Sequence, residues 1–395
     1  MDHETALASL FSAEGRRDPY PAYDAIRAHA PAFQALDGRW FVTTHALVTR
    51  LLRDPALRVA DANDYDGFWP DWRANRGVAS IVLSLLGTNP PDHTRVRRAA
   101  AATFTARRVA GMRDVITTQV KELITALPAS ADFMSAFAYP LPIGVICALL
   151  GVPESDRPWF RQRAADLTVV LEPISSQEEM DLADVAGREL EDYFIGLIAE
   201  RRRDPQEDLT SALVGAGSGL TGAEMLANLV LLLVAGFETT TNLLGTGLEL
   251  LLSRPRQAAR LRSDPELAPA FVEEILRYDS PVQLTSRFTT TPADLGDGVV
   301  LAPGASVTML LGAANRDPER YPDPHRFDPD RGTIQPVSFG GGAHYCLGAP
   351  LARLEAQVAL PLLLTMLPKL ALDGPPERRD RLVLRGYSTL PITTG

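Results

Sequence analysis

The longest helical pattern in this chain constrains its architecture most, and it runs from Gly222 to Leu252. Apolar residues dominate it. Thr221 and Glu224 at its start match a capping box, in which each side chain satisfies a free backbone amide of the first helical turn. At about 1.5 Å per residue such a helix measures roughly 45 Å. That length crosses a whole domain, so we expect the middle of the helix to be buried on all sides.

Other helical patterns surround this segment, whereas strand-like segments are short. Helices are predicted where apolar residues recur with helical periodicity, at 92–102, 109–127, 181–202, 267–278 and 347–364. Strands are predicted at 40–43, 287–291, 299–301, 307–311 and 382–385. The many prolines between residues 315 and 336 predict a loop. No Gly/Ser-rich linker divides the chain, so residues 1–395 are expected to form a single domain, mainly α with small β-sheets.

The composition is that of a globular protein with a net negative charge. Of the 395 residues, 46% are hydrophobic and 22% are charged, which is typical of a chain that builds a sizeable core. The 39 Lys and Arg against 49 Asp and Glu give a net charge of −10. This balance argues against a nucleic-acid partner, because phosphate contacts need clustered cations.

The cysteines and the N-terminal residues indicate the compartment. The chain has 2 cysteines, Cys147 and Cys346, which lie too far apart in sequence to form a disulfide framework. Cys147 lies in an apolar run and is expected to pack in the core. The N-terminus has no basic-then-apolar signal segment. The apolar run at 229–237 is much shorter than the roughly 20 residues of a membrane span. We expect a cytoplasmic monomer without membrane contact.

The strongest chemical signal is the run from Phe339 to Gly348, FGGGAHYCLG. Its consecutive glycines allow a tight turn and close approach to a flat group. Cys346 then opens an apolar helix, where free amides and the helix dipole favour an anion and lower the pKa of a thiol. A thiolate at this position is a ready metal ligand. A buried structural cysteine is the alternative, and zinc is less suitable, because zinc sites need four ligands and Cys147 and the histidines offer no paired spacing.

Two helical segments carry polar residues that need an explanation. Glu274 and Arg277 share one face of a predicted helix beside a buried apolar stripe, where charges must be paired. Glu238 and Thr239 lie in the middle of the long apolar helix, where an acid and a hydroxyl are costly unless they have a task. The Thr239 hydroxyl could instead bond back to a carbonyl one turn earlier. The small residue Ala235 would let a ligand lie against the backbone.

Basic residues occur at two further positions. His93 and Arg97 share a face of the helix that begins after two prolines, and Arg287 begins a predicted strand. Taken alone, each of them would be an ordinary solvated basic residue.

Taken together and in this order, these segments resemble the cytochrome P450 family. The run at 339–348 matches the family's haem-binding loop, Phe-Gly-x-Gly-x-His-x-Cys-x-Gly, at every fixed position. The resemblance implies the cytochrome P450 fold, with haem b (iron protoporphyrin IX) between the long central helix and the cysteine-loop helix. It makes Cys346 the iron ligand. The other cofactor-binding residues it implies are His93, Arg97, Ala235, Arg287, Phe339, Gly340, His344 and Gly348.

The resemblance also assigns structural and catalytic roles. It makes Glu274 and Arg277 a structural pair that Arg326, in the proline-rich segment, completes. It implies that Thr239 hydrogen-bonds the bound dioxygen and that Glu238 relays protons. The net reaction would be hydroxylation or epoxidation of an apolar organic substrate, such as a secondary metabolite or its precursor.

The electrons are expected to come from outside the chain. No dinucleotide fingerprint follows a predicted strand, so we expect a separate ferredoxin with an NAD(P)H-dependent reductase. A local basic patch could bind an acidic ferredoxin, although a merely solvated face is the alternative. The residues of this patch are Arg95, Arg98, Arg107, Arg108 and Arg353.

Several apolar residues are predicted to form the walls of a substrate pocket, and core packing is the alternative for each of them. The candidates are Phe68, Trp69, Leu86, Val230, Val282, Leu284 and Thr389. Two rival functions share the same motifs. One is a haem-thiolate enzyme of another outcome, oxidative coupling or peroxide-driven oxidation. The other is a haem-binding sensor, which would not need Glu238 and Thr239 together.

Overall fold

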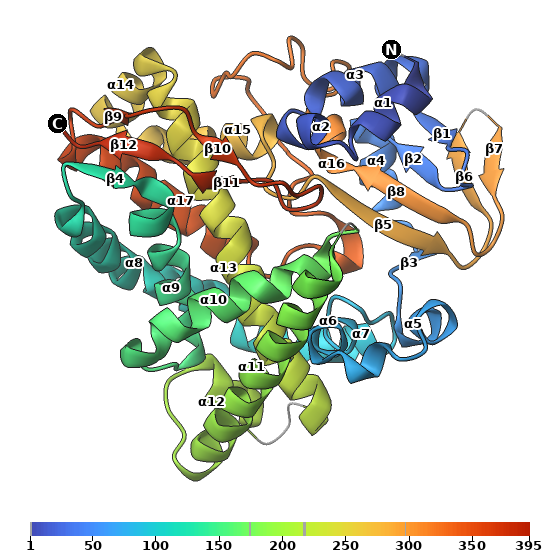
Figure 1. The fold of residues 1–395 in the computed structure, drawn as a ribbon, viewed down its shortest axis with the longest axis horizontal. Helices are drawn as coiled ribbons and strands as arrows, with labels where there is room; N and C mark the ends of the chain where they lie inside the picture. The colour runs from blue at the N-terminus through green and yellow to red at the C-terminus, as the bar shows by residue number, and fades with distance from the viewer. Residues whose placement is uncertain (1, 174, 216–218, 297) are drawn as a thin grey trace.

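One long helix, α13 (Gly222–Leu252), passes through the middle of the molecule, and the other elements are arranged around it (Figure 1). The computed structural model describes residues 2–173, 175–215, 219–296 and 298–395. Figure 1 shows a helix-rich part on one side of α13, and on the other side a part in which strands lie beside the N-terminal helices.

Helices form most of the structure. The short 3₁₀ or π turns are η1 (Trp72–Ala74), η2 (Met134–Ala138), η3 (Glu154–Asp156), η4 (Thr168–Leu171), η5 (Pro265–Leu267) and η6 (Gly342–His344). The α-helices besides α13 are α1 (His3–Ser9), α2 (Ala13–Arg17), α3 (Tyr20–His29), α4 (His45–Leu51), α5 (Ala62–Phe68), α6 (Arg76–Val82), α7 (Asp92–Thr103), α8 (Ala106–Ala126), α9 (Pro140–Leu150), α10 (Arg157–Leu167), α11 (Gln177–Arg203), α12 (Leu209–Val214), α14 (Pro255–Ser263), α15 (Ala268–Tyr278), α16 (Leu311–Ala314) and α17 (Ala349–Met366).

The strands form one larger sheet and several small ones. The larger sheet has the order β1-β2-β8-β5-β3, with β2 parallel and β5 antiparallel to β8. Its register places Arg287 opposite Val307. The strands are β1 (Ala32–Gln34), β2 (Trp40–Val42), β3 (Leu57–Arg58), β4 (Ser130–Asp132), β5 (Leu284–Thr289), β6 (Ala293–Gly296), β7 (Val299–Leu301), β8 (Ser306–Leu310), β9 (Ala371–Leu372), β10 (Glu377–Arg378), β11 (Tyr387–Thr389) and β12 (Pro391–Thr393).

Helix α13 has the bounds and the start that its sequence predicts. The Glu224 amide donates to Thr221 Oγ1 at 3.2 Å, and the Thr221 amide donates to Glu224 Oε2 at 2.8 Å, which confirms the capping box. By length and hydropathy alone this helix could cross a membrane, but 50% of its most apolar window is buried inside the protein. Its apolar character is therefore explained by its place in the core.

The main hydrophobic core surrounds α13 and draws on α8, α9, α15 and α17. Leu229, Leu233 and Leu244 of α13 are fully buried within it. Cys147 on α9 is also fully buried, which confirms that it packs as a core residue. Separate clusters lie under the N-terminal helices and along the larger sheet.

One predicted strand, at 382–385, is wrong. The segment contributes only an isolated bridge between Val282 and Leu384. The reason is that the Glu172 carboxylate accepts the backbone amides of residues 382, 383 and 384 at 2.8–2.9 Å, so these amides are not available to a neighbouring strand. The strand of this region, β11, begins at Tyr387 instead.

Candidate functional site

The cysteine loop, which we define as Phe339–Gly348, is held by backbone geometry that only glycine provides. Gly340 and Gly342 have φ angles of 70° and 63°, in the left-handed region that favours glycine. A Cβ on Gly342 would also lie 2.3 Å from the Leu52 carbonyl oxygen. The Cys346 amide donates to the Phe339 carbonyl at 2.9 Å and closes the loop.

The Cys346 sulfur lies at the N-terminus of helix α17, whose N-cap residue is Gly348. Surrounding protein raises the pKa of the thiol by burial, whereas hydrogen bonds from the Gly348 and Ala349 amides and the charge of Arg97 lower it. Despite this packing on the loop side, Cys346 is exposed. A sulfur that accepts hydrogen bonds from backbone amides and is also accessible is suited to bind a metal as a thiolate.

The middle of α13 presents an accessible face within an otherwise buried helix. Ala235 is exposed and Thr239 is half-buried, although Val234 and Phe237 beside them are buried. Residues four apart share one face of a helix, so Ala235 and Thr239 lie on the same side. The Thr239 hydroxyl donates to the Ala235 carbonyl at 2.8 Å, the back-bond that its sequence position allows. Glu238, in contrast, is only 1% exposed.

Four basic side chains from separate elements form a group that we call the basic cluster: His93, Arg97, Arg287 and His344. The rings of His93 and His344 lie 4.2 Å apart, centroid to centroid. Arg97 donates to the Tyr345 carbonyl at 2.6 Å, which ties α7 to the cysteine loop. Arg287 donates to the Thr285 hydroxyl and to the Ser286 carbonyl, each at 2.8 Å.

The electrostatics of the basic cluster suit it to bind an anionic group. Burial lowers the pKa of Arg287 to about 10. Burial, reinforced by the charges of Arg287, His93 and Arg97, lowers the pKa of His344 to about 3. His93 Nε2 is buried without a hydrogen-bond partner. Within the described ranges none of the four pairs with a carboxylate, so an anionic group of a cofactor would satisfy them.

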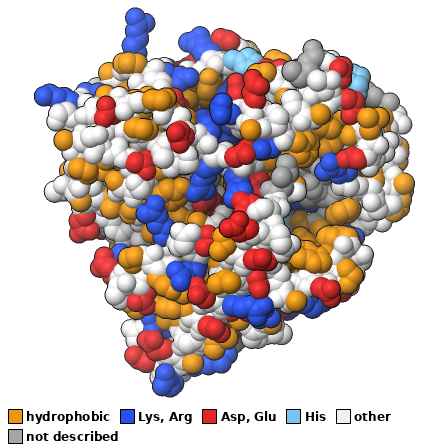
Figure 2. All heavy atoms as spheres, in the orientation of Figure 1, with side chains coloured by type: hydrophobic (Ala, Val, Ile, Leu, Met, Phe, Trp, Pro, Cys, Tyr) orange, Lys and Arg blue, Asp and Glu red, His pale blue; other side chains and the backbone are white. Residues whose placement is uncertain are grey.

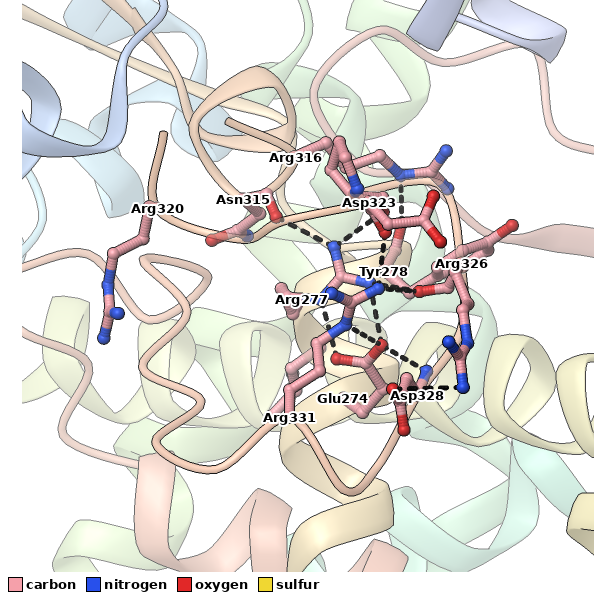
Figure 3. A network of polar contacts seen from close by, with 12 residues as sticks. Glu274, Arg277, Tyr278, Asn315, Arg316, Arg320, Asp323, Arg326, Asp328 and Arg331 are labelled. Atoms are coloured by element: carbon pink, nitrogen blue, oxygen red, sulfur yellow. Dashed lines mark hydrogen bonds and ion pairs between the residues drawn. The ribbon is translucent and has the colours of Figure 1, made fainter. Parts of the chain in front are cut away.

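Glu274 and Arg277 on α15 form a buried ion pair (Figure 3). Both side chains are 0% exposed, and two hydrogen bonds of 2.6 and 2.7 Å join them. Arg277 also donates to the carbonyls of Asn315 and Pro324 at 3.1 and 2.9 Å. The pair thereby ties α15 to the proline-rich segment that precedes the cysteine loop.

The prediction that Arg326 completes this pair is wrong. The Arg326 side chain is 67% exposed and lies 3.5 Å from Asp328, while only its backbone carbonyl accepts from Arg277. Arg331 takes the expected place, with Nε 3.2 Å from Glu274 Oε1 and its side chain 9% exposed (Figure 3). Arg331 also donates to the backbone carbonyls of Pro322, Asp323 and Arg326, and these bonds hold its guanidinium beside Glu274.

The predicted substrate walls fall into two groups. Phe68, Trp69 and Leu86 are exposed, and Val282, Leu284 and Thr389 are half-buried, so each retains accessible surface. Val230 is 0% exposed and packs in the main core. A substrate-facing role for Val230 therefore has no support from its surroundings.

Two further residues near α13 were not predicted from the sequence. Arg379, in the segment after β10, forms an ion pair with Glu238, and it also donates to the Tyr139 hydroxyl. Both lie far from Glu238 in the chain. No local pattern could have linked them to it.

Comparisons with known proteins agree with this geometry. A family model described as Cytochrome P450 matches residues 161–369. The cytochrome P450 monooxygenase PikC of Streptomyces venezuelae is 41% identical over 408 residues, which cover 98% of this chain and 92% of that protein. The 6-deoxyerythronolide B hydroxylase of Saccharopolyspora erythraea is 38% identical over 98% of this chain and 99% of that protein.

Solved structures give the same result for the fold. The crystal structure of P450BioI, in complex with an acyl carrier protein ligated to hexadec-9Z-enoic acid, has a TM-score of 0.91 and 34% identity, covering 97% of this chain and 100% of that chain. A Mycobacterium smegmatis CYP164A2 structure has a TM-score of 0.89 and 39% identity, covering 99% of this chain and 100% of that chain. The chain therefore belongs to the cytochrome P450 family of haem-thiolate monooxygenases, whose fold it adopts.

Proposed function

We propose that Cys346 is the thiolate ligand of the haem iron and that the basic cluster binds the haem propionates. The observation that carries this proposal is the basic cluster itself, four buried or half-buried basic side chains without a carboxylate partner in the described residues. Phe339, Gly340 and Gly348 of the cysteine loop would lie against the proximal face of the haem. Ala235, exposed in the middle of α13, leaves room on the other face.

The reaction we propose is the insertion of one oxygen atom into an apolar organic substrate, by hydroxylation or epoxidation. The bound haem supplies the activation of dioxygen. One oxygen atom enters the substrate, and the other is reduced to water with two electrons from NAD(P)H and two protons. The protein must therefore bind the substrate, exclude bulk water and deliver protons.

Thr239 and Glu238 are the residues that we assign to proton delivery. Thr239 presents its hydroxyl on the accessible face of α13, within reach of a ligand that lies against Ala235. Glu238 is the adjacent acid, and burial raises its pKa, which brings its protonation nearer to neutral pH. An acid beside an accessible hydroxyl is suited to pass a proton inward.

Replacing Thr239 by alanine should uncouple the enzyme. We expect the share of consumed dioxygen that is released as hydrogen peroxide to rise several-fold, because the hydroxyl that guides protons is lost. Peroxide yield per NADH oxidised, with a surrogate ferredoxin and reductase, measures this. Thr239→Ser should restore the wild-type yield, and Thr240→Ala, at a buried neighbouring position, should leave it unchanged. An unchanged yield in Thr239→Ala would instead support the peroxide-driven alternative.

We propose an apolar secondary metabolite, or its precursor, as the substrate. The relative from Saccharopolyspora erythraea is named for hydroxylating 6-deoxyerythronolide B, a reaction of this class. The apolar side chains of Phe68, Leu86, Val282 and Leu284 are exposed or half-buried, and they would provide walls of matching character. A screen of apolar natural products for substrate-induced shifts of the haem spin state would narrow the class.

We propose a ferredoxin, with an NAD(P)H-dependent reductase, as the electron donor. Arg98 on α7 and Arg107 on α8 are exposed. Helix α7 is bonded to the cysteine loop through Arg97 and the Tyr345 carbonyl, and α8 packs against α17, the helix that follows this loop. Two members of the predicted patch are neutralised: Arg95 pairs with Glu224 at 2.5 Å and Arg353 pairs with Glu273 at 2.5 Å. The attraction for an acidic ferredoxin therefore rests chiefly on the exposed arginines at the start of α8 and on α7.

Reversing the charges of Arg98 and Arg107 to glutamate should slow the first electron transfer about 10-fold or more at low salt and flatten its salt dependence. Stopped-flow reduction by an acidic ferredoxin measures this rate. Arg202→Glu with Arg203→Glu, at the exposed end of α11, changes the net charge equally and should leave the rate unchanged. Equal slowing in both double variants would exclude a specific ferredoxin surface.

We further propose that residues 1–395 act as one catalytic domain and that the enzyme is a cytoplasmic monomer. Phe339 of the cysteine loop packs against the core around α13, and Leu52 of the cluster along the sheet lies against Gly341 of the same loop, which supports one unit. Light scattering of the purified protein tests the monomer, and cell fractionation tests the compartment.

A further inference from the structure

Glu238 is bound by a side chain that comes from the other end of the sequence. Arg379 follows β10, and its guanidinium contacts both Glu238 Oε1 and the Tyr139 hydroxyl. The Glu238 side chain is 1% exposed and the Arg379 side chain is 20% exposed. Arg379 therefore reaches from near the surface to an acid in the interior.

The two oxygens of Glu238 have different surroundings. Oε1 accepts from Arg379 and, at 3.4 Å, from Asn242 one turn further along α13. Oε2 is buried and has no hydrogen-bond partner within the described residues. A buried carboxylate oxygen without a donor is costly, which makes this group ready to accept a proton.

Opposing influences act on the ionisation of Glu238. Burial raises its pKa, and the charge of Glu172 adds to that effect. The charge of Arg379 lowers the pKa of Glu238 most strongly, and Asn242 and Arg381 lower it to a smaller degree. Of the two arginines, Arg379 is the one in direct contact with the carboxylate.

The remaining groups around the contact belong to Tyr139 and its neighbours. The Tyr139 ring lies 5.4 Å from the Arg379 guanidinium and 4.6 Å from that of Arg161. Burial raises the pKa of Tyr139, so its hydroxyl stays protonated at neutral pH. Figure 2 shows Lys and Arg side chains gathered over the region of β10 and β11 in the middle of this face. Arg379 of the segment after β10 contacts Glu238 on α13.

We propose that Arg379 is a positioning residue that holds Glu238 as an oriented carboxylate and thereby sets the pH range in which Glu238 takes up a proton for the dioxygen site. The inference rests on the proposed role of Glu238 in proton delivery. Arg379 acts through Glu238 and needs no contact with substrate or haem. It follows that loss of its charge raises the pKa of Glu238.

The direct test is the protonation of Glu238 itself, measured by infrared difference spectroscopy of the holoenzyme as pH is varied. Glu238→Gln identifies the carboxylic-acid band, because that variant lacks it. In Arg379→Gln we expect the band to persist to a pH about one unit or more higher than in the wild type. Arg379→Lys keeps the charge and should restore most of the wild-type titration.

The second readout is functional and uses the same variants without added substrate. The pH dependence of peroxide released per dioxygen consumed, with NADH and a surrogate ferredoxin and reductase, should move to higher pH in Arg379→Gln. Arg16→Gln is the matched control: it breaks the 2.5 Å ion pair of Arg16 with Asp380, the residue after Arg379, without touching Glu238. Its titration and its pH profile should equal those of the wild type.

The outcomes separate this inference from the proposed function. If Glu238→Gln changes peroxide release but Arg379→Gln leaves both the band and the profile in place, Arg379 has no positioning role. The same conclusion follows if Arg16→Gln shifts them as far as Arg379→Gln does. If Glu238→Gln leaves peroxide release unchanged, the proposed role of Glu238 in proton delivery is wrong. The infrared titration then still decides whether Arg379 controls the ionisation of Glu238.

Discussion

Glu274→Ala should lower the free energy of unfolding by about 3–5 kcal/mol, because it leaves the Arg277 guanidinium buried without its counter-charge. Both side chains are 0% exposed, so bulk solvent does not screen the charge that remains. Glu274 also accepts the Asp328 amide at 2.7 Å and Arg331 Nε at 3.2 Å, so the variant loses several contacts at once. Urea denaturation of the holoenzyme measures the change in the free energy of unfolding, provided that the wild type and the variant unfold with the same m-value.

The control for this prediction is Arg326→Ala in the same segment. Its side chain is 67% exposed, and its role in the network is played by a backbone carbonyl that alanine retains. We expect a loss below about 1 kcal/mol. Arg331→Ala should be intermediate, at about 1.5–3 kcal/mol, because it removes a hydrogen bond to a charged group. Equal losses in Arg326→Ala and Glu274→Ala would contradict the arrangement in Figure 3.

Cys346→Ser should reduce product formation by more than about 100-fold, a larger effect than the 10–100-fold typical of losing an outer-shell partner of a metal ligand. Serine keeps the size of the side chain but does not supply the thiolate that promotes cleavage of the O–O bond. Turnover of a substrate found in the spin-shift screen, normalised to bound haem, measures the effect.

Cys147→Ala provides the matched control, since Cys147 is the other cysteine and is fully buried on α9. It should cost some stability through the small cavity that it leaves, but turnover per haem should stay at the wild-type value. Turnover retained in Cys346→Ser would show that another residue binds the iron.

The sequence predicts those parts of the fold whose signals are local. The capping box at Thr221 and the apolar run behind it define α13, and both are properties of neighbouring residues. The cysteine loop is equally local, because Gly340 and Gly342 adopt positive φ angles that other residues avoid. Glu274 and Arg277 lie one helical turn apart, so their pairing could also be predicted.

Other features depend on contacts between distant segments and could not be predicted in this way. Arg326 and Arg331 lie in the same proline-rich segment, and contacts of Arg331 with Glu274 and with backbone carbonyls of the folded segment distinguish the two. The segment at 382–385 has an apolar pattern, but Glu172, from a remote loop, takes its amides. The contact of Arg379 with Glu238 likewise joins residues with no common local pattern.

The measurement that tests the central claim most directly is the difference spectrum of the reduced protein with and without carbon monoxide, recorded after expression with ample haem supply. Thiolate ligation by Cys346 predicts the strongly red-shifted Soret band of a cysteine-bound ferrous haem in the wild type and in Cys147→Ala, and its absence in Cys346→Ser. A colourless wild-type protein, or a red-shifted band that survives in Cys346→Ser, would contradict the account.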